Sequence, residues 1–316
     1  MSDLSTVRML GPDDPDRELA LHLALNVAPA RGGGRAVVVA DLLRRVWSGP
    51  QSIDMVFGAY LADRMTAACL VVESPGHSGM IFVTDPGRIP RPGVDEKGLV
   101  LALKALRAAA WERSLAILEV LIAPDAAGLS QVLDRSGFTY LTRLLYLQRQ
   151  VDIAMPRLPV AEGLELITYE GGDTALFLSV LEESYAQSLD CPELVGLRRI
   201  EDAFEGHRAT GDHDPRFWWV ALRDGKPAGV LLLSRVTERT AMEVVYVGVA
   251  QVSRGQDVGN ALMDLALRTC IQESAKVLAL AVDCANTPAR RMYERWGFVQ
   301  TGARDAWIAS PTGNEA

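Results

Sequence analysis

Cysteine, long apolar runs and clustered basic charge are all scarce in this sequence. Its four cysteines lack the spacing of metal ligands, so they indicate reduced thiols, and we expect no metal site. No apolar run approaches membrane-spanning length, and the first residues, MSDLSTVRML, lack a basic region followed by a long apolar stretch. These absences predict a cytoplasmic protein without a membrane partner.

The charge balance is acidic, with 32 Lys and Arg against 40 Asp and Glu and a formal net charge of −8. This balance argues against general nucleic-acid binding and favours a cationic amine as partner. A chain of 316 residues with 49% hydrophobic composition is long enough for two domains, each with its own core. We expect it to work as a monomer or homodimer.

The most informative segment runs from residue 254 to residue 298, and a run of β-branched residues precedes it. Near-unbroken apolar runs at Glu243–Val249 and Val277–Val282 predict two strands that are buried on both faces. Apolar residues at helical spacing lie between them, after the loop Arg254–Leu262, which reads RGQDVGNAL. The order strand, glycine loop, helix and strand predicts a βαβ crossover with the loop at the helix N-terminus.

This loop is suited to bind an anion. The start of a helix exposes unpaired N–H groups and the positive end of the helix dipole, and Gly255 and Gly259 let an anion approach the backbone. The loop lacks the Gly-Lys-Ser/Thr of a P-loop and the G-x-G-x-x-G of a dinucleotide site. Asp283 stands about where a ribose-binding acid would follow, but the chain holds too few further βα units for a Rossmann half. A well-capped packing helix without a ligand is the other interpretation.

A second motif, NTPARRMYERWGF, spans Asn286 to Phe298. Thr287 is predicted to cap a helix with Pro288 at its first position, and Gly297 suits a left-handed residue after the last turn. Tyr293 lies on the predicted amphipathic helix, where it either packs in the core or donates a proton from a phenol of pKa near 10.

Together the two motifs resemble the GNAT acyltransferases, whose acyl-CoA loop reads Q/R-x-x-G-x-G/A. Arg254 and Gly259 match its first and last positions, and Asp257 stands where the middle glycine is usual. The Asp257 carboxylate must point away from a pyrophosphate or weaken binding by repulsion. The family's later motif is matched at five positions, Asn286, Ala289, Tyr293, Gly297 and Phe298.

The resemblance implies direct attack of an amine on acetyl-CoA, with Tyr293 protonating the departing thiolate. It also suggests Glu243 as the proton acceptor, acting through water, although an acid at a strand start is often only solvated. Alternation puts Glu243, Val245, Val247 and Val249 on one face. The implied cofactor site comprises Val247, Gly248, Val249, Arg254, Gly255, Gln256, Asp257, Val258, Gly259, Asn260, Asn286, Ala289 and Tyr293.

The family resemblance places the acceptor, a small-molecule or peptide amine, against the segment between Tyr185 and Asp214. The candidate acceptor residues are Tyr185, Asp190, Cys191 and His207. Asp190 either holds an ammonium group or starts a helix, and no histidine is adjacent in sequence to activate the Cys191 thiol. His207 is more typical of a helix end than of a catalyst.

The first half repeats the order of the second. Gly137-Phe138 lies 160 residues before Gly297-Phe298, and the same step places Leu133 and Ala126 where Tyr293 and Asn286 would be. The first-half loop 93–98 also puts Asp95 and Glu96 where phosphate would lie. This half is therefore predicted to be a degenerate copy without a proton donor.

The predicted fold class is α/β (α+β), with two tandem GNAT-like domains, each a mixed, mostly antiparallel sheet flanked by helices. The boundaries are residues 1–154 and 155–316, joined by a Pro-containing linker from Met155 to Gly163. The second domain is predicted to hold the acetyl-CoA site of an N-acetyltransferase, and the alternative is a non-catalytic acyl-CoA-binding or scaffold protein. Predicted elements of the second half are a strand at 163–168, helices at 173–185 and from 191 or 192 to about 206, and a hairpin of 217–222 with 227–235.

Overall fold

The structure, a computed structural model, describes residues 4–26, 53–88, 93–151, 156, 158–236 and 240–311. The chain divides into two compact units: unit 1 comprises residues 1–141 and 304–316, and unit 2 comprises residues 142–303. Met155 and Arg157 of the predicted linker lie outside the described residues. Within the described ranges, no helix has the length and apolar character needed to cross a membrane.

The sheet of unit 2 has the strand order β6-β11-β10-β9-β8-β7. Its strands are β6 (Thr139–Gln150, in this unit from Thr142), β7 (Glu165–Thr168), β8 (Asp212–Arg223), β9 (Lys226–Val236), β10 (Ala241–Val249) and β11 (Val277–Asp283). Among the described strands of this unit, only β10 and β11 pair in parallel, which confirms the βαβ crossover. The predicted hairpin is confirmed as β8 and β9, joined by Asp224 and Gly225 at φ 51° and 71°.

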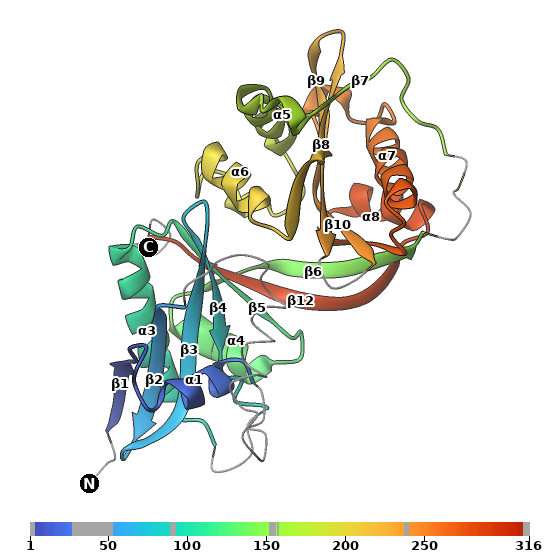
Figure 1. Cartoon of the computed structure of the whole chain (residues 1–316). Coiled ribbons are helices and arrows are strands. Elements are labelled where there is room, and N and C mark those ends of the chain that lie inside the picture. The colour runs from blue at the N-terminus through green and yellow to red at the C-terminus, as the bar shows by residue number, and fades with distance from the viewer. Residues whose placement is uncertain are drawn as a thin grey trace. The chain divides into compact units, whose positions relative to one another are not determined.

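Helices cover both faces of this sheet (Figure 1). On one face α5 (Thr174–Tyr185) and α6 (Ile200–Arg208) form a core with Trp218 and Val230, and on the other α7 (Val258–Gln272) and α8 (Thr287–Arg295) pack over Leu231 and Leu280. The helix predicted from residue 191 or 192 to 206 is wrong in its first half. Cys191 and Gly196 have φ of 47° and 85°, so only a short 3-10 turn, Pro192–Leu194, precedes α6.

Unit 1 has the same arrangement, with the strand order β1-β2-β3-β4-β5-β12. Its strands are β1 (Ser5–Met9), β2 (Met55–Leu61), β3 (Arg64–Ser74), β4 (Ser78–Val83), β5 (Ile117–Ile122) and β12 (Val299–Ala309, in this unit from Arg304). Helices α3 (Glu96–Glu112) and α4 (Ala127–Arg135) cover one face, and α1 (Arg17–Ala24) packs on the other. β4 and β5 are the parallel pair.

Each unit takes its last strand from the other half of the sequence. In unit 2, β6 pairs antiparallel with β11, and in unit 1, β12 pairs antiparallel with β5. The compact units therefore differ from the sequence halves 1–154 and 155–316. The hydrophobic pattern can predict that β6 and β12 are strands. It does not predict their partners, because each pairs with whichever sheet edge is exposed to it in the fold.

The ends of α4 and α8 repeat at a step of 160 residues. Gly137 and Gly297 have φ of 78° and 82°, and the N–H of Phe138 and of Phe298 donates to the carbonyl of Leu133 and of Tyr293, each at 3.0 Å. A left-handed glycine followed by such a backward bond is a Schellman-type helix end. The predicted left-handed role of Gly297 is confirmed.

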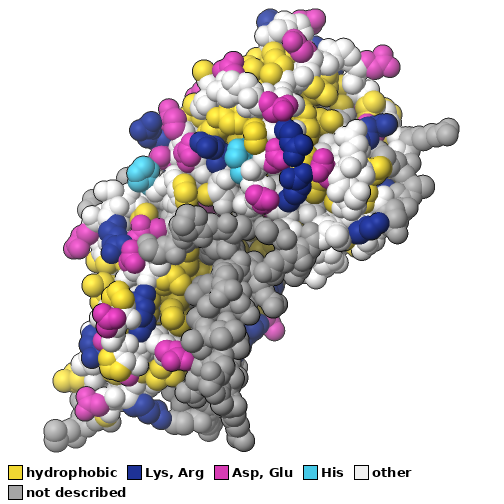
Figure 2. Space-filling view, in the orientation of Figure 1, with side chains coloured by type: hydrophobic (Ala, Val, Ile, Leu, Met, Phe, Trp, Pro, Cys, Tyr) yellow, Lys and Arg dark blue, Asp and Glu magenta, His cyan; other side chains and the backbone are white. Residues whose placement is uncertain are grey.

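The face shown in Figure 2 carries basic and acidic side chains in alternation rather than in separate fields. Hydrophobic side chains are exposed between them. Exposed arginines in unit 2 are paired with neighbouring acids, as in Arg216 with Asp214 at 2.6 Å and Arg268 with Asp264 at 2.6 Å. Local pairing of this kind leaves little long-range field of one sign.

Candidate functional site

The parallel strands β10 and β11 separate partway along their length. They pair from Ala241 with Val277 to Val244 with Leu280, and β10 then continues to Val249 while staying paired with β9. The β11 side of residues 245–249 therefore has no strand partner in the described part of unit 2. Backbone polar groups without a partner are available to a ligand that can take the place of a strand.

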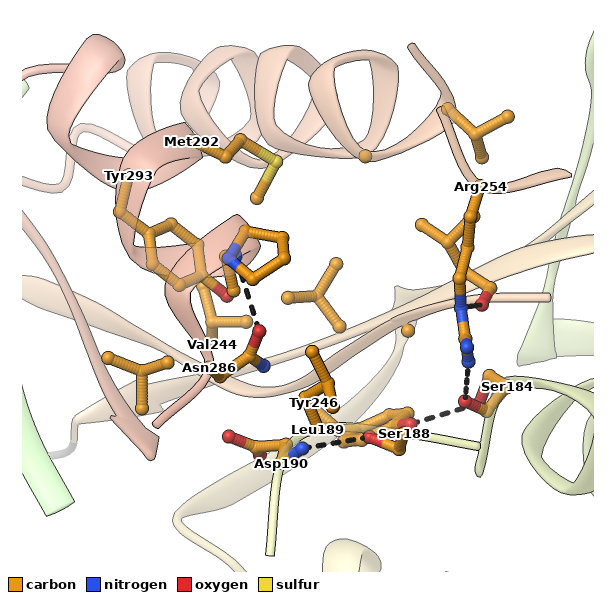
Figure 3. Close-up of a pocket in the computed structure, with 18 of the residues that line it drawn as sticks. Ser184, Ser188, Leu189, Asp190, Val244, Tyr246, Arg254, Asn286, Met292 and Tyr293 are labelled. Atoms are coloured by element: carbon orange, nitrogen blue, oxygen red, sulfur yellow. Dashed lines mark hydrogen bonds between the residues drawn. The ribbon is translucent and has the colours of Figure 1, made fainter. Parts of the chain in front are cut away.

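A cavity of about 420 Å³ fills this split. Its walls come from the 184–190 segment, from β10 and β11, from the loop before α7 and from α8. It is lined by Ser184, Gln187–Asp190, Val244–Val249, Ser253–Gly255, Asp257–Asn260, Leu280–Val282, Asn286, Pro288, Ala289, Met292, Tyr293 and Arg295. Figure 3 shows Tyr293 and Met292 on one side of it and Arg254 beside Ser184 on another.

The N-terminus of α7 presents a row of free donors to this cavity. None of the backbone N–H groups of residues 255–260 donates a hydrogen bond to another described residue, and the first N–H in use is that of Ala261, which donates to the Asp257 carbonyl at 3.0 Å. The first turn of α7 contains no acidic residue. Unpaired N–H groups at the positive end of a helix dipole are an anion site.

Asp257 caps α7 in a left-handed conformation, with φ 58° and ψ 14°. This backbone explains why glycine is usual at the position, since aspartate is one of the few other residues that tolerate it. The carboxylate makes no bond to the helix N–H groups and instead accepts the Asn260 side-chain amide at 3.0 Å. Asn260 in turn accepts the buried Trp296 indole N–H at 3.0 Å, which holds its amide in place.

Gly259 lies where α7 and α8 approach each other. A Cβ at this position would be 3.0 Å from Met292 Sδ, which is tighter than ordinary van der Waals contact. A larger residue would therefore push Met292 into the cavity.

The predicted helix start at the second motif is corrected by one residue. Asn286, rather than Thr287, is the N-cap of α8, and its side chain accepts the Ala289 N–H at 3.3 Å. Thr287 and Pro288 are the first two helical residues. Asn286 and Ala289 both line the cavity, as does Pro288.

Tyr293 is 5% exposed and lines the cavity from α8. Burial raises the pKa of its phenol, and the negative charge of Asp190 raises it further. The hydroxyl has no hydrogen-bond partner among the described residues. The group therefore stays protonated at neutral pH and is free to donate.

Glu243 does not lie on the face that alternation predicted. A β-bulge between Val244 and Tyr246 breaks the register, so Val247 and Val249 pack toward α7, whereas Val245 and Tyr246 pack toward α5 and α6. Glu243 precedes the bulge, faces the α5 side with Val245, and is not among the lining residues. Burial raises the pKa of its carboxyl.

The four predicted acceptor residues separate into two groups. Asp190 lines the cavity, and burial raises the pKa of its carboxyl. Tyr185, Cys191 and His207 are not among the lining residues. Tyr185 shares a hydrogen bond of 2.7 Å with His207 Nε2, and its pKa is raised to about 12 by burial while that of His207 is lowered to about 3 by burial.

Tyr246 connects this second group to the cavity. Its ring stacks on His207 at 5.3 Å and meets Tyr185 edge-on at 5.0 Å, and its hydroxyl lies 3.0 Å from Ser184 Oγ. Tyr185 and His207 thus pack against Tyr246, which lines the cavity, without lining it themselves. Sequence reasoning missed Tyr246 because the bulge that turns it was not visible in the strand pattern.

The remaining residues of the predicted cofactor site differ in whether they line the cavity. Gln256 is not a lining residue, because its side chain bonds Arg223 and the Val252 carbonyl on the exposed side. Val247, Gly248, Val249, Gly255 and Val258 do line the cavity. Met292 was missed, although it lies on the same helical face as Ala289 and Tyr293.

Asp283 is 2% exposed and serves as a structural acid at the end of β11. Its carboxylate accepts the N–H groups of Cys191 at 3.1 Å and Ala285 at 2.7 Å and the hydroxyl of Thr142 at 2.7 Å. A ribose-binding acid in a Rossmann half must keep its carboxylate oxygens for the ligand, whereas those of Asp283 accept bonds from the protein. The sheet order also excludes that fold.

Comparison with known proteins gives a consistent family. The sequence model described as "Acetyltransferase (GNAT) family" matches residues 181–298. A mycothiol acetyltransferase of Streptomyces griseus subsp. griseus is 33% identical over 174 residues, which cover 55% of this chain and 54% of that protein. A mycothiol acetyltransferase of Thermomonospora curvata is 31% identical over 241 residues, 76% of this chain and 75% of that protein.

Several such relatives, from Streptomyces and Brachybacterium, are matched over only about half of their own length. Among solved structures, a GCN5-related N-acetyltransferase from Sphaerobacter thermophilus aligns with a TM-score of 0.62 at 17% identity, over 97% of this chain and 95% of that chain. At that identity the likeness concerns the fold, and it extends over both units.

Proposed function

The chain belongs to the GNAT acetyltransferase family, and from this premise we propose that it transfers an acetyl group from acetyl-CoA to the amine of a small molecule, with its reaction centre in unit 2. One observation carries the proposal. Gly255 and residues 257–260, whose N–H groups are free, line one cavity together with the unpaired edge of β10 and Tyr293.

The residues present suit acetyl-CoA. The N–H row at the start of α7 would hold the pyrophosphate, and the open edge of β10 at Val247–Val249 would pair with the pantetheine amides. The Asp257 carboxylate is directed to Asn260 and so does not fill the anion site. When bound, acetyl-CoA supplies the acetyl group as a thioester.

Tyr293 is proposed as the general acid. As the bond from the acceptor nitrogen to the acetyl carbon forms, the carbon–sulfur bond breaks and the sulfur takes a proton from the Tyr293 hydroxyl. The raised pKa of Tyr293 keeps that proton available across the neutral range. The tyrosinate then recovers a proton from solvent.

The acceptor amine must lose a proton before or during attack. We retain Glu243 as the proposed base, acting through water because it lies behind the cavity wall, and assign to Asp190 the binding of the acceptor ammonium. The raised pKa of Glu243 brings its proton affinity closer to that needed near neutral pH.

The acceptor class follows from the relatives. Proteins named mycothiol acetyltransferase act on a small molecule, so the amine of which mycothiol is the acetylated form is the first acceptor to include in a panel of small amines and peptide N-termini. Release of CoA with any of them measures turnover.

Binding is tested first, by calorimetry and by amide hydrogen exchange with CoA. We expect CoA to slow exchange in residues 249–260 of unit 2 far more than in residues 93–98 of unit 1. Equal protection of both segments would contradict a single site. No binding would reject the transferase, and binding without turnover over the whole panel would favour a non-catalytic acyl-CoA-binding protein.

A further inference from the structure

The Arg254 side chain is directed at the end of a helix. Its guanidinium donates to the carbonyls of Gln187 at 2.9 Å, Ser184 at 3.1 Å and Ala186 at 2.7 Å, and its Nε donates to the Val249 carbonyl at 3.2 Å. A guanidinium has five N–H donors, and four of them are used here. Little donor capacity is left for a phosphate (Figure 3).

Three of these carbonyls lie at the end of α5, and that of Val249 belongs to β10. The helix ends at Tyr185 without a basic residue in its last turn, and the left-handed residue that follows its cap is Gln187, with φ 53°, rather than a glycine. The last carbonyls of a helix lack partners within it and lie at the negative end of its dipole, where a cation is favourable. Arg254 therefore supplies, from the loop before α7, the cap that α5 lacks.

The segment that begins in the last turn of α5, residues 184–191, is fixed at its other end as well. The Asp283 carboxylate accepts the Cys191 N–H at 3.1 Å, and the Asp190 carboxylate accepts the Asp283 N–H at 3.0 Å. Between these two anchors, Ser188, Leu189 and Asp190 line the cavity. Leu189 is 53% exposed, so its own burial does little to hold it there.

We infer that Arg254 is a positioning residue that couples the acetyl-CoA loop to the acceptor wall formed by residues 184–191. Because one end of this wall is attached to the loop before α7 and the other to the end of β11, loss of the Arg254 attachment should loosen the end next to α5 and leave the end at Cys191 in place. The inference deepens the proposed function by assigning acceptor recognition to this segment, with Arg254 acting on it through the backbone.

The test is amide-resolved hydrogen exchange on the full chain without ligand, comparing wild type with Arg254→Met, Arg254→Lys and Arg223→Met. The Ala186 and Ser188 amides are bonded within the turn that Arg254 holds, to Glu182 and Tyr185. We expect Arg254→Met to speed their exchange by at least about tenfold and Arg254→Lys to have an intermediate effect.

Two internal controls accompany it. The Cys191 amide, held by Asp283, should keep most of its protection. The Arg223 side chain bonds only the exposed Gln256 side chain among the described residues, so Arg223→Met should leave residues 184–191 unchanged. If Arg254→Met fails to fold, exchange of the Ala186 and Ser188 amides in Arg254→Lys still tests the inference. Lysine keeps a cation at the helix end but has fewer N–H donors.

Calorimetry with CoA separates this role from phosphate binding. For a positioning role, the Kd for CoA of Arg254→Met should stay within about threefold of wild type, while the KM for an accepted amine rises about tenfold. Unchanged exchange at Ala186 and Ser188 would overturn the inference, whatever happens to the Kd. Should wild type fail to bind CoA, the transferase proposal falls, yet the exchange comparison still decides the role of Arg254.

Discussion

Helices α3 and α7 both follow the central strands of their units, and both begin at an aspartate, Asp95 and Asp257. Asp95 has an extended backbone, with φ −77° and ψ 99°, and its carboxylate accepts the N–H groups of Lys97 at 3.2 Å and Gly98 at 3.1 Å. Asp257 is left-handed, and its carboxylate turns to the Asn260 side chain. The Asp95 carboxylate thus occupies the anion site at the start of α3, whereas Asp257 leaves the N–H groups at the start of α7 open.

The strands that precede these helices, β4 and β10, also differ in how open their edges are. In unit 1, β4 ends at Val83 soon after its last pair with β5 at Ile81, whereas in unit 2, β10 runs on from Val244 to Val249 after leaving β11. The open edge that a pantetheine could pair with is therefore long only in unit 2. Local backbone conformation, more than residue identity, distinguishes the two units.

The third difference is the residue one turn before the C-terminus of α4 and α8. Leu133 is fully buried, and Tyr293 occupies the equivalent place in unit 2 and lines the cavity. We expect Tyr293→Phe to lower kcat by about 10²–10³-fold, because a general acid contributes this much, with little change in the KM for acetyl-CoA. Steady-state kinetics with an accepted amine measures it.

The pH profile checks the same assignment. Because the pKa of Tyr293 is raised and a general acid acts in its protonated form, the fall in wild-type kcat that Tyr293 causes should come at high pH, and this alkaline limb should be lost in Tyr293→Phe. Leu133→Met is the control in unit 1 and should leave kcat unchanged. A tyrosine variant with wild-type turnover at every pH would reduce Tyr293 to a packing residue.

Much of this architecture could be predicted from the sequence because the signals were local. The apolar runs, the Asp-Gly turn and the glycine after α8 specify strands, a hairpin and a helix end without reference to distant residues. The 160-residue step works for the same reason, because α4 and α8 end with the same backbone bonds.

What failed depended on contacts between distant segments. The bulge at Val245 was invisible because the run after Glu243, Val-Val-Tyr-Val, is hydrophobic on both faces, so either register satisfies the pattern. The bonds of the Arg254 side chain to carbonyls near residue 186 were not visible in its motif either. The exchange of β6 and β12 was equally hidden, because a strand pattern does not name its partner.

A matched pair of glycine substitutions compares the two helix starts. Asp95→Gly should lower the free energy of unfolding by about 1 kcal/mol, because it removes the cap bonds to Lys97 and Gly98 and adds chain entropy to the unfolded state. Asp257→Gly should change it by less than about 0.5 kcal/mol, since no cap bond is lost and glycine adopts φ 58° without strain. Urea denaturation measures both, and equal losses would mean that Asp257 caps α7 in solution.

The smallest effect concerns the charge at the open helix start. Asp257→Asn keeps a residue that tolerates the left-handed backbone and can still accept the Asn260 amide, so it removes the negative charge and little else. A carboxylate at the positive end of a helix opposes an incoming phosphate by about 0.3–1 kcal/mol, so the Kd for CoA should tighten by about two- to fivefold at low salt. The gain should shrink as salt screens it, and Asp95→Asn should leave CoA binding unchanged. Weaker binding by Asp257→Asn would show instead that the carboxylate is needed to shape the loop before α7. Aspartate would then support phosphate binding at this position, where glycine is usual.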